Sequence, residues 1–106
     1  MDELLQGLKA AAEPTRLRIL ALCAHAELTV SDLVEILGQS QPRVSRHLKL
    51  LVDGGLLLRH QEGSFAYYRL AEQGPGAELA RQLVDLLPAE DPLHAADLER
   101  LQQVQD

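Results

Sequence analysis

Residues 39–55 combine a hydrophobic side and a polar, cationic side at helical spacing, a combination that suits contact with DNA. The apolar positions that follow an i, i+4, i+7, i+8 spacing, and therefore share one side of a helix, are Val44, Leu48, Leu51 and Val52. The residues that fall on or beside the opposite side are Pro42, Arg43, Ser45, Arg46 and Lys49. Pro42 fits the first helical turn, where Ser40 or Gln41 can accept hydrogen bonds from the free amides. A helix lined in this way with serine, arginine and lysine fits the DNA major groove.

A shorter helix is predicted immediately before this one. Thr29 or Ser31 can cap its start, and Gly38 suits its end. Its apolar stripe consists of Leu33, Ile36 and Leu37. Only residues 39–41 separate the two helices, as in a helix-turn-helix, where the second helix contacts bases and the first crosses the backbone. An ordinary helical hairpin with a solvated basic side fits these two helices equally well.

The residues after the second helix favour the DNA-binding alternative. Leu56–Glu62 and Phe65–Leu70 have the composition of two β-strands, and Gly63 supplies the backbone freedom that a tight turn between them needs. A helix-turn-helix followed by a hairpin is a winged helix, a mainly α-helical fold with a small β-hairpin wing. Arg59 and Arg69 lie on the strands, from which their side chains could reach phosphates beside the groove.

Four segments of the chain carry the motifs of one protein family. They are Leu8–Leu20, like the family's ALADPTRLRIL; Glu27–Leu33, like ELCVCDL; Ser40–Leu51, like SQPxVSxHLxxL; and Gly54–Leu70, like AGLVxxRREGRxxxYRL. On these motifs the chain resembles the ArsR/SmtB family of winged-helix transcriptional repressors over most of residues 4–88. The resemblance implies a homodimer that represses transcription by covering its operator and releases the DNA when a signal arrives.

The predicted DNA contacts lie on the second helix and the wing. Base edges and nearby phosphates are assigned to Gln41, Arg43, Ser45 and Arg46. The DNA backbone is assigned to Ser40, Lys49, Arg59, Gly63 and Ser64. His47, which belongs to the family motif, is expected either to pack inside the protein or to contact a phosphate. The expected partner is double-stranded DNA with an imperfect inverted repeat, because a symmetric dimer places its recognition helices about 34–36 Å apart.

Both ends of the winged helix carry apolar stripes that suggest dimerisation. The leucines concerned are Leu4, Leu5 and Leu8 near the N-terminus and Leu79, Leu83, Leu86 and Leu87 further along. The second stripe lies in a helix that Gly74, Pro75 and Gly76 open and Pro88 closes. The stripes could instead complete the core of the monomer, and we expect one of them to do so in part. In the family that the chain resembles, the two corresponding helices form the dimer.

Length and composition agree with one small domain. We assign the winged helix-turn-helix to residues 1–88 and a helical tail to residues 89–106. No apolar stretch approaches the ~20 residues that span a membrane. Asp2 and Glu3 stand where a secretory signal peptide would carry positive charge. The single cysteine suits a reducing environment, so a cytoplasmic location is expected.

The net charge of −6 argues at first against a DNA-binding protein. Its distribution answers part of this objection, because residues 39–70 contain five basic and two acidic residues, whereas the remainder contains five basic and fourteen acidic ones. The local field of the reading surface governs docking more than the total charge does. We therefore expect weak non-specific DNA binding, in which base contacts supply more of the affinity than usual.

The effector that releases the DNA is not expected to be a conventional thiolate-bound metal. The thiolate site of the family needs cysteines in the segment that here contains Thr29 and Ser31, and hydroxyl groups are poor ligands for soft metals. The lone Cys23 lies in an apolar run and is interpreted as a small buried hydrophobic residue. One thiol also cannot form an intrachain disulfide.

The tail carries two further features. Asp91, His94 and Asp97 have a three-residue spacing that could gather oxygen and nitrogen ligands, although a solvated surface is their expected role. Residues 91–106 predict an amphipathic helix and are similar to the junction in repressors that continue into an S-adenosylmethionine-dependent methyltransferase. That similarity favours a small-molecule effector, for example an adenosyl compound, over a metal. No metal site or cofactor is predicted.

Two other functions stay open at this point. A winged helix can bind a protein partner through its acidic surface without binding DNA, although this leaves the basic surplus of residues 39–70 unexplained. The chain could also be the regulatory domain of a longer, methyltransferase-fused protein. Catalysis is not expected, because no glycine-rich phosphate loop and no nucleophile beside a base is recognisable in the sequence.

Overall fold

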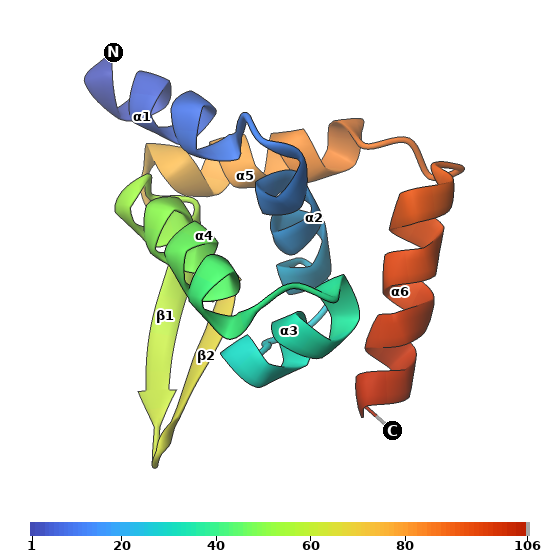
Figure 1. The fold of residues 1–106 in the computed structure, drawn as a ribbon. Helices are drawn as coiled ribbons and strands as arrows, with labels where there is room; N and C mark the ends of the chain where they lie inside the picture. Colours follow the sequence, from blue (N-terminus) through green and yellow to red (C-terminus); the bar gives the residue numbers. More distant parts are fainter. Residues whose placement is uncertain (106) are drawn as a thin grey trace.

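Six helices and a two-stranded antiparallel hairpin make up residues 1–105, the part of the chain that this computed structural model describes (Figure 1). The elements are α1 (Asp2–Ala11), α2 (Pro14–Cys23), α3 (Val30–Leu37), α4 (Gln41–Asp53), β1 (Leu57–Glu62), β2 (Phe65–Leu70), α5 (Pro75–Leu86) and α6 (Pro92–Gln105). Their order confirms the predicted winged helix-turn-helix.

The helix-turn-helix consists of α3 and α4, and local side chains define both helices. Thr29 and Asp32 form a reciprocal capping box at the start of α3, where each side chain accepts a hydrogen bond from the backbone amide of the other. Gly38 ends α3 in the left-handed conformation, with φ of 67°. Ser40 caps α4 by accepting a hydrogen bond from the amide of Arg43. These caps confirm the predicted boundaries.

The hairpin is short and is attached to the helical body at its base. β1 and β2 pair in a register that runs from Leu57 opposite Leu70 to Glu62 opposite Phe65. Gly63 occupies the turn with φ of 62°, as a two-residue hairpin loop requires. Leu28 and Tyr68 exchange two backbone hydrogen bonds of 3.0 and 2.8 Å, which fix β2 against the segment that leads into α3.

The core lies where α2, α3, α4 and the base of the hairpin meet. The large side chains that are fully buried there are Ile19, Leu20, Leu22, Leu28, Leu33, Ile36, Val44, Leu48, Leu51 and Leu56. Cys23 is also buried, which confirms its predicted role as a small hydrophobic residue. Val44, Leu48 and Leu51 thus hold one side of α4 against the body, and this fixes which side of the helix faces outward.

α1 and α5 pack against each other above the helix-turn-helix (Figure 1). Leu79 and Leu83 are only partly buried and pack against the core, so part of the second leucine stripe completes the monomer. Leu86 is 77% exposed. The leucines of α1, which are Leu4, Leu5 and Leu8, are 40–47% exposed. The described chain therefore leaves an apolar surface open across these two helices.

α6 packs against α2 and α3 rather than projecting from the domain (Figure 1). Leu101 is buried, and Leu98 and Val104 pack against the core, as the predicted amphipathic helix requires. Asp97 contradicts the expectation of a solvated surface, because its side chain is 1% exposed and receives two hydrogen bonds of 2.9 Å from Arg18. The spacing of the acidic residues does not indicate which of them faces a cationic partner on a distant helix.

Within residues 1–105 no helix is both long and apolar enough to cross a membrane. The same residues contain no group of three or more His, Cys, Asp or Glu side chains arranged to hold a metal ion.

Candidate nucleic-acid interface

The outward side of α4 carries most of the residues that the sequence assigns to DNA. Gln41, Arg43, Arg46 and Lys49 are exposed, and Ser45 is half-buried. The amide nitrogen of Gln41 donates a hydrogen bond of 2.9 Å to the Ser45 hydroxyl, so the two side chains lie together in the first turns of the helix. This arrangement presents hydroxyl, amide and guanidinium groups on one surface, which is the set of groups that reads base edges.

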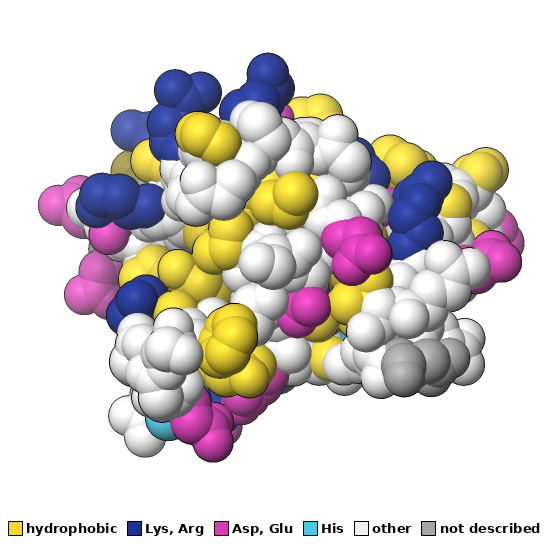
Figure 2. Space-filling model, turned by 60° about the horizontal axis from the view of Figure 1, so that its bottom comes forward, with side chains coloured by type: hydrophobic (Ala, Val, Ile, Leu, Met, Phe, Trp, Pro, Cys, Tyr) yellow, Lys and Arg dark blue, Asp and Glu magenta, His cyan; other side chains and the backbone are white. Residues whose placement is uncertain are grey.

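Arg43 and Arg46 differ from Lys49 on the same helix because no carboxylate of residues 1–105 forms an ion pair with either arginine. Lys49 instead pairs with Asp53 one turn away at 2.9 Å, but both side chains are well exposed. Exposed pairs of this kind contribute only about 0.3–0.5 kcal/mol, so a phosphate can displace Asp53. Figure 2 shows Lys and Arg side chains on the side of the molecule that carries α4 and the hairpin.

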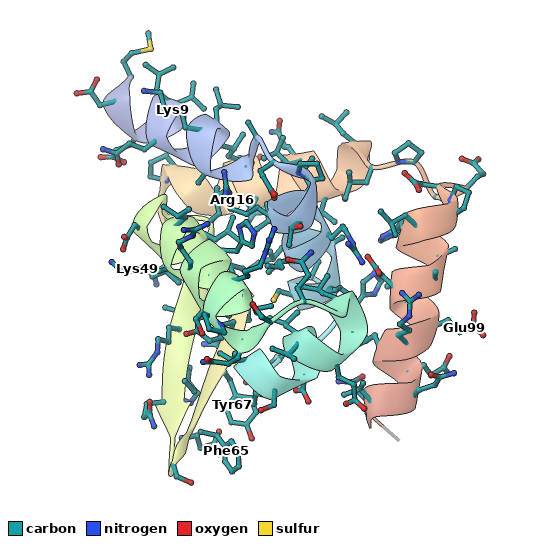
Figure 3. All side chains as sticks on the ribbon, in the orientation of Figure 1. Lys9, Arg16, Lys49, Phe65, Tyr67 and Glu99 are labelled. Atoms are coloured by element: carbon teal, nitrogen blue, oxygen red, sulfur yellow. The ribbon has the colours of Figure 1, made fainter. Side chains whose placement is uncertain are left out.

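The hairpin presents three of the expected backbone-contacting residues and, beside its turn, one aromatic residue that sequence reasoning missed. Arg59, Gly63 and Ser64 are exposed. Arg59 donates a hydrogen bond of 3.0 Å to the side chain of Gln61, whose amide nitrogen donates in turn to the Gly63 carbonyl. Phe65 follows the turn and is 57% exposed (Figure 3). Its position directly after the tight turn, opposite Glu62, is the signal that could have identified it.

Arg69, whose side chain could reach a phosphate according to its place in the sequence, pairs with two carboxylates of its own domain. Its guanidinium bonds to Glu27 at 2.5 Å and to Glu72 at 2.8 Å. The hydrogen bond to Glu27 is the main reason that the pKa of Arg69 is raised. Glu27 precedes Leu28, and the backbone pairing of Leu28 with β2 brings this carboxylate to the arginine. The positive charge at this position is thus neutralised within the domain.

His47 lies inside the protein, so of its two expected roles the structure supports packing and not a DNA contact. The residue is 6% exposed. Its Nδ1 lies 3.2 Å from the guanidinium of Arg16, and its Nε2 lies 3.9 Å from a carboxylate oxygen of Glu13. Arginine only donates hydrogen bonds, so Nδ1 must accept and the proton of the neutral ring sits on Nε2, facing Glu13.

The surroundings of His47 connect three helices. Arg16 also donates a hydrogen bond of 2.6 Å to the carbonyl of Ala10, so its side chain joins the end of α1 to α4 (Figure 3). Burial is the main reason that the pKa of His47 is lowered, and Arg16, Arg43 and Arg46 lower it further against the opposing effect of Glu13. The buried side of α4 is therefore held by a polar network in addition to its leucines.

An exposed second helix in a helix-turn-helix, followed at once by a hairpin wing, defines a winged helix-turn-helix protein. Residues 13–57 match the family model described as "Bacterial regulatory protein, arsR family". The chain belongs to this family.

Relatives with known names support the same family assignment. The arsenical resistance operon repressor of Escherichia coli K12 is 46% identical over 72 residues, which cover 67% of this chain and 62% of the relative. The repressor of the same name from Bacillus subtilis is 35% identical over 79 residues, which cover 74% of this chain and 75% of the relative. The chain thus spans less than two thirds of the length of the first of these proteins.

A solved structure supports the fold. The winged helix-turn-helix DNA-binding domain of Mb0332 from Mycobacterium bovis, described as homodimeric, matches with a TM-score of 0.70 and 33% identity. The match covers 80% of this chain and 74% of that one. The similarity of the tail to methyltransferase-fused repressors is not confirmed by these comparisons.

Proposed function

We propose that this chain is a sequence-specific DNA-binding repressor of transcription. The observation that carries the proposal is the exposed polar side of α4, where Arg43 and Arg46 have no ion-pair partner within residues 1–105. Guanidinium groups placed at the start of a recognition helix can bind guanine edges or phosphates. The relatives named as repressors support the same function.

In the proposed complex, α4 lies in the major groove and the hairpin lies beside it. Gln41, Arg43, Ser45 and Arg46 contact base edges and nearby phosphates. The contacts to the DNA backbone come from Ser40, Lys49, Arg59, Gly63 and Ser64. His47 is left out of this set because its ring is enclosed by α2 and α4.

We propose further that the repressor binds as a homodimer to an imperfect inverted repeat. The exposed leucines of α1 and α5 form an apolar surface that a second copy can cover. The homodimeric description of the Mycobacterium bovis domain supports this assembly. Two copies related by a two-fold axis would place their α4 helices about one turn of DNA apart, or about 34–36 Å.

The effector in this proposal is a small molecule and not a thiolate-bound metal. Burial raises the pKa of the Cys23 thiol to about 12, so a thiolate is not available there at neutral pH. The Thr29 hydroxyl accepts the hydrogen bond that caps α3. Neither residue offers the free, soft ligand that an arsenical or a similar metal needs. For this reason we do not extend the arsenical resistance named for the relatives to this chain.

The test is a fluorescence anisotropy titration of the purified chain against duplex DNA from the region upstream of its gene. Saturable binding that survives an excess of unrelated duplex supports the proposal. The Arg43→Ala, Arg46→Ala double variant should lose this binding while retaining the circular dichroism of the parent protein. Absence of specific binding at low salt would instead favour a winged helix that docks a protein partner.

A further inference from the structure

A cleft of about 390 Å³ lies between α2, the end of α5 and the start of α6, away from the DNA-facing side of α4. Leu17, Leu87 and Leu93 contribute much of its apolar wall. Leu93 is 47% exposed and Leu87 is half-buried, so the walls remain accessible. A volume of this size holds a small organic molecule with an apolar body.

Charged groups at the cleft favour a cationic ligand. Glu13 and Asp91 both line it. Each places one carboxylate oxygen on a backbone amide at 2.9 Å, Glu13 on that of Arg16 and Asp91 on that of Leu93. The second carboxylate oxygen of Glu13 lies 3.9 Å from Nε2 of His47, whereas that of Asp91 has no hydrogen-bond partner within residues 1–105, so Asp91 keeps the larger free acceptor capacity.

The one arginine that lines the cleft does not cancel the negative charge of Glu13 and Asp91. Arg18 is bound through two hydrogen bonds to the buried carboxylate of Asp97, and its positive charge is therefore compensated within the protein. The carboxylates of Glu13 and Asp91 consequently leave the cleft with an excess of negative charge. An anionic ligand would have to approach both of them across an apolar surface.

The cleft is connected to the helix-turn-helix through α6. Asp91 and Leu93 lie at the start of α6, and the same helix packs along its length against α3. The Arg18–Asp97 pair joins α6 to α2 directly beneath the cleft. A ligand that displaces the start of α6 must therefore disturb either this buried pair or the contact with α3.

We propose that this cleft is the effector site, that its ligand is a small organic cation with an apolar body, and that α6 transmits binding to the helix-turn-helix. The part of this inference that concerns DNA release rests on the proposed repressor function. The binding part does not, and the two are therefore tested separately.

The binding test uses the full chain without DNA and a matched pair of probes, 1-naphthylmethylammonium and 1-naphthylacetate. Both probes share one apolar body and differ in the sign of their charge. Calorimetry should show that the cation binds about tenfold or more tightly than the anion, as a charge-assisted hydrogen bond would produce. Amide NMR shifts caused by the cation should centre on Leu17, Leu87 and Leu93.

Conservative variants assign the binding to the two carboxylates. Glu13→Gln combined with Asp91→Asn removes both charges but keeps an oxygen that can cap each helix, and should abolish the preference for the cation. Glu99→Gln is the matched control, because Glu99 is an exposed carboxylate of α6 that points away from the body (Figure 3). The control should bind both probes as the parent protein does.

Three results would overturn the binding part. The anion could bind as tightly as the cation, the double variant could retain the full preference, or the NMR shifts could map to another surface. The binding part would also be overturned if cation binding were lost as the protein concentration rises through the range in which the chain dimerises. That result would show that a second copy covers the cleft.

The coupling test measures operator affinity with and without saturating cation. The proposal expects the cation to weaken operator binding by the parent protein and to leave binding by Asp91→Asn less affected. Operator binding without probe tests the repressor function alone, so its failure is separable from failure of the cleft. Unchanged operator affinity in the presence of bound cation would refute transmission through α6.

Discussion

Arg43 and Arg46 hold the clearest functional position at the scale of single residues. Both project from the exposed side of a helix whose other side is anchored by Val44 and Leu48. Lys49 and Arg69 carry the same charge, but each has a carboxylate partner within the domain. A free guanidinium on a rigid helix loses little conformational freedom on binding compared with one on a flexible loop. We therefore expect the affinity to concentrate on these two arginines.

Replacement of Arg46 by alanine should weaken specific operator binding by about 1–3 kcal/mol, the usual contribution of one good contact to a base. The stability of the domain should not change, because Arg46 is exposed and has no ion pair within residues 1–105. Anisotropy titrations against operator and unrelated DNA measure the effect. Arg81→Ala is the control, since Arg81 lies on α5 and pairs with Glu78. Equal operator affinity in Arg46→Ala and the parent protein would remove this residue from the interface.

His47 should make the stability of the protein sensitive to acid. The folded protein holds its pKa below the ordinary value of 6.5, chiefly because the ring is buried, so the unfolded chain takes up the proton first as pH falls. This contribution to stability is complete above about pH 6.5 and is lost as the pH falls from there toward the folded pKa. Urea unfolding at pH 7.5 and 5.5 should show a smaller loss for His47→Gln than for the parent protein.

The exposed His60 provides the comparison for this experiment. His60→Gln should retain the acid sensitivity of the parent protein, because this side chain is exposed and lies outside the buried network around His47. If His47→Gln and His60→Gln responded identically to pH, the buried network of Arg16 and Glu13 would not control the titration of His47.

At the scale of elements, local patterns predicted the two helices and the hairpin, but the helices alone did not distinguish a helix-turn-helix from an ordinary helical hairpin. The buried side of α4, the caps at Thr29 and Ser40 and the turn at Gly63 all depend on residues within one helical turn or one hairpin. Such patterns are visible in the sequence because the segment that forms each element also contains the residues that determine its structure.

The contacts that sequence reasoning could not supply join residues that are far apart in the chain. His47 meets Arg16 across 31 positions, Arg69 meets Glu27 across 42, and Arg18 meets Asp97 across 79. From the sequence alone, an isolated arginine or aspartate is expected to be solvated, because its partner comes close only in the folded chain. The cleft beside α6 was unpredictable for the same reason, because three separate segments create it.

The docking of α6 depends on the carboxylate of Asp97. Its side chain is 1% exposed, whereas that of Arg18 is 19% exposed. Removal of one partner from such a pair leaves the other charge without compensation, so Asp97→Ala should lower the free energy of unfolding by about 3 kcal/mol, the lower end of the usual range. Urea unfolding followed by circular dichroism measures this value. Glu99→Ala, an exposed change in the same helix, should leave it nearly unaltered, and an equal effect of the two changes would mean that the ion pair does not hold α6.

At the scale of the whole molecule, charge is distributed unevenly along the chain. The sequence contains ten basic and sixteen acidic residues, yet residues 39–70, which include α4 and the hairpin, contain five basic and only two acidic ones. Each phosphate contact releases counterions, so a dimer that makes about six to ten such contacts should lose on the order of 10³–10⁵ in affinity between 50 and 200 mM salt. Arg59→Gln removes one contact from each copy and should lower the slope of log affinity against log salt by about 2.

Assembly is the property of the whole molecule on which operator recognition depends most. Leu86 is 77% exposed on α5, so an isolated chain gains little from it, whereas a second copy could bury it together with the leucines of α1. Leu86→Asp should therefore leave the helical content unchanged but shift the protein from dimer to monomer in sedimentation velocity. Operator affinity should fall steeply, because one half-site contact replaces two that are joined in a single complex. Phe65→Asp, which places the same charge at the exposed tip of the hairpin, should remain dimeric. A dimeric Leu86→Asp protein would show that the two-fold axis lies elsewhere, and the expected half-site spacing would then have to be derived from a different surface.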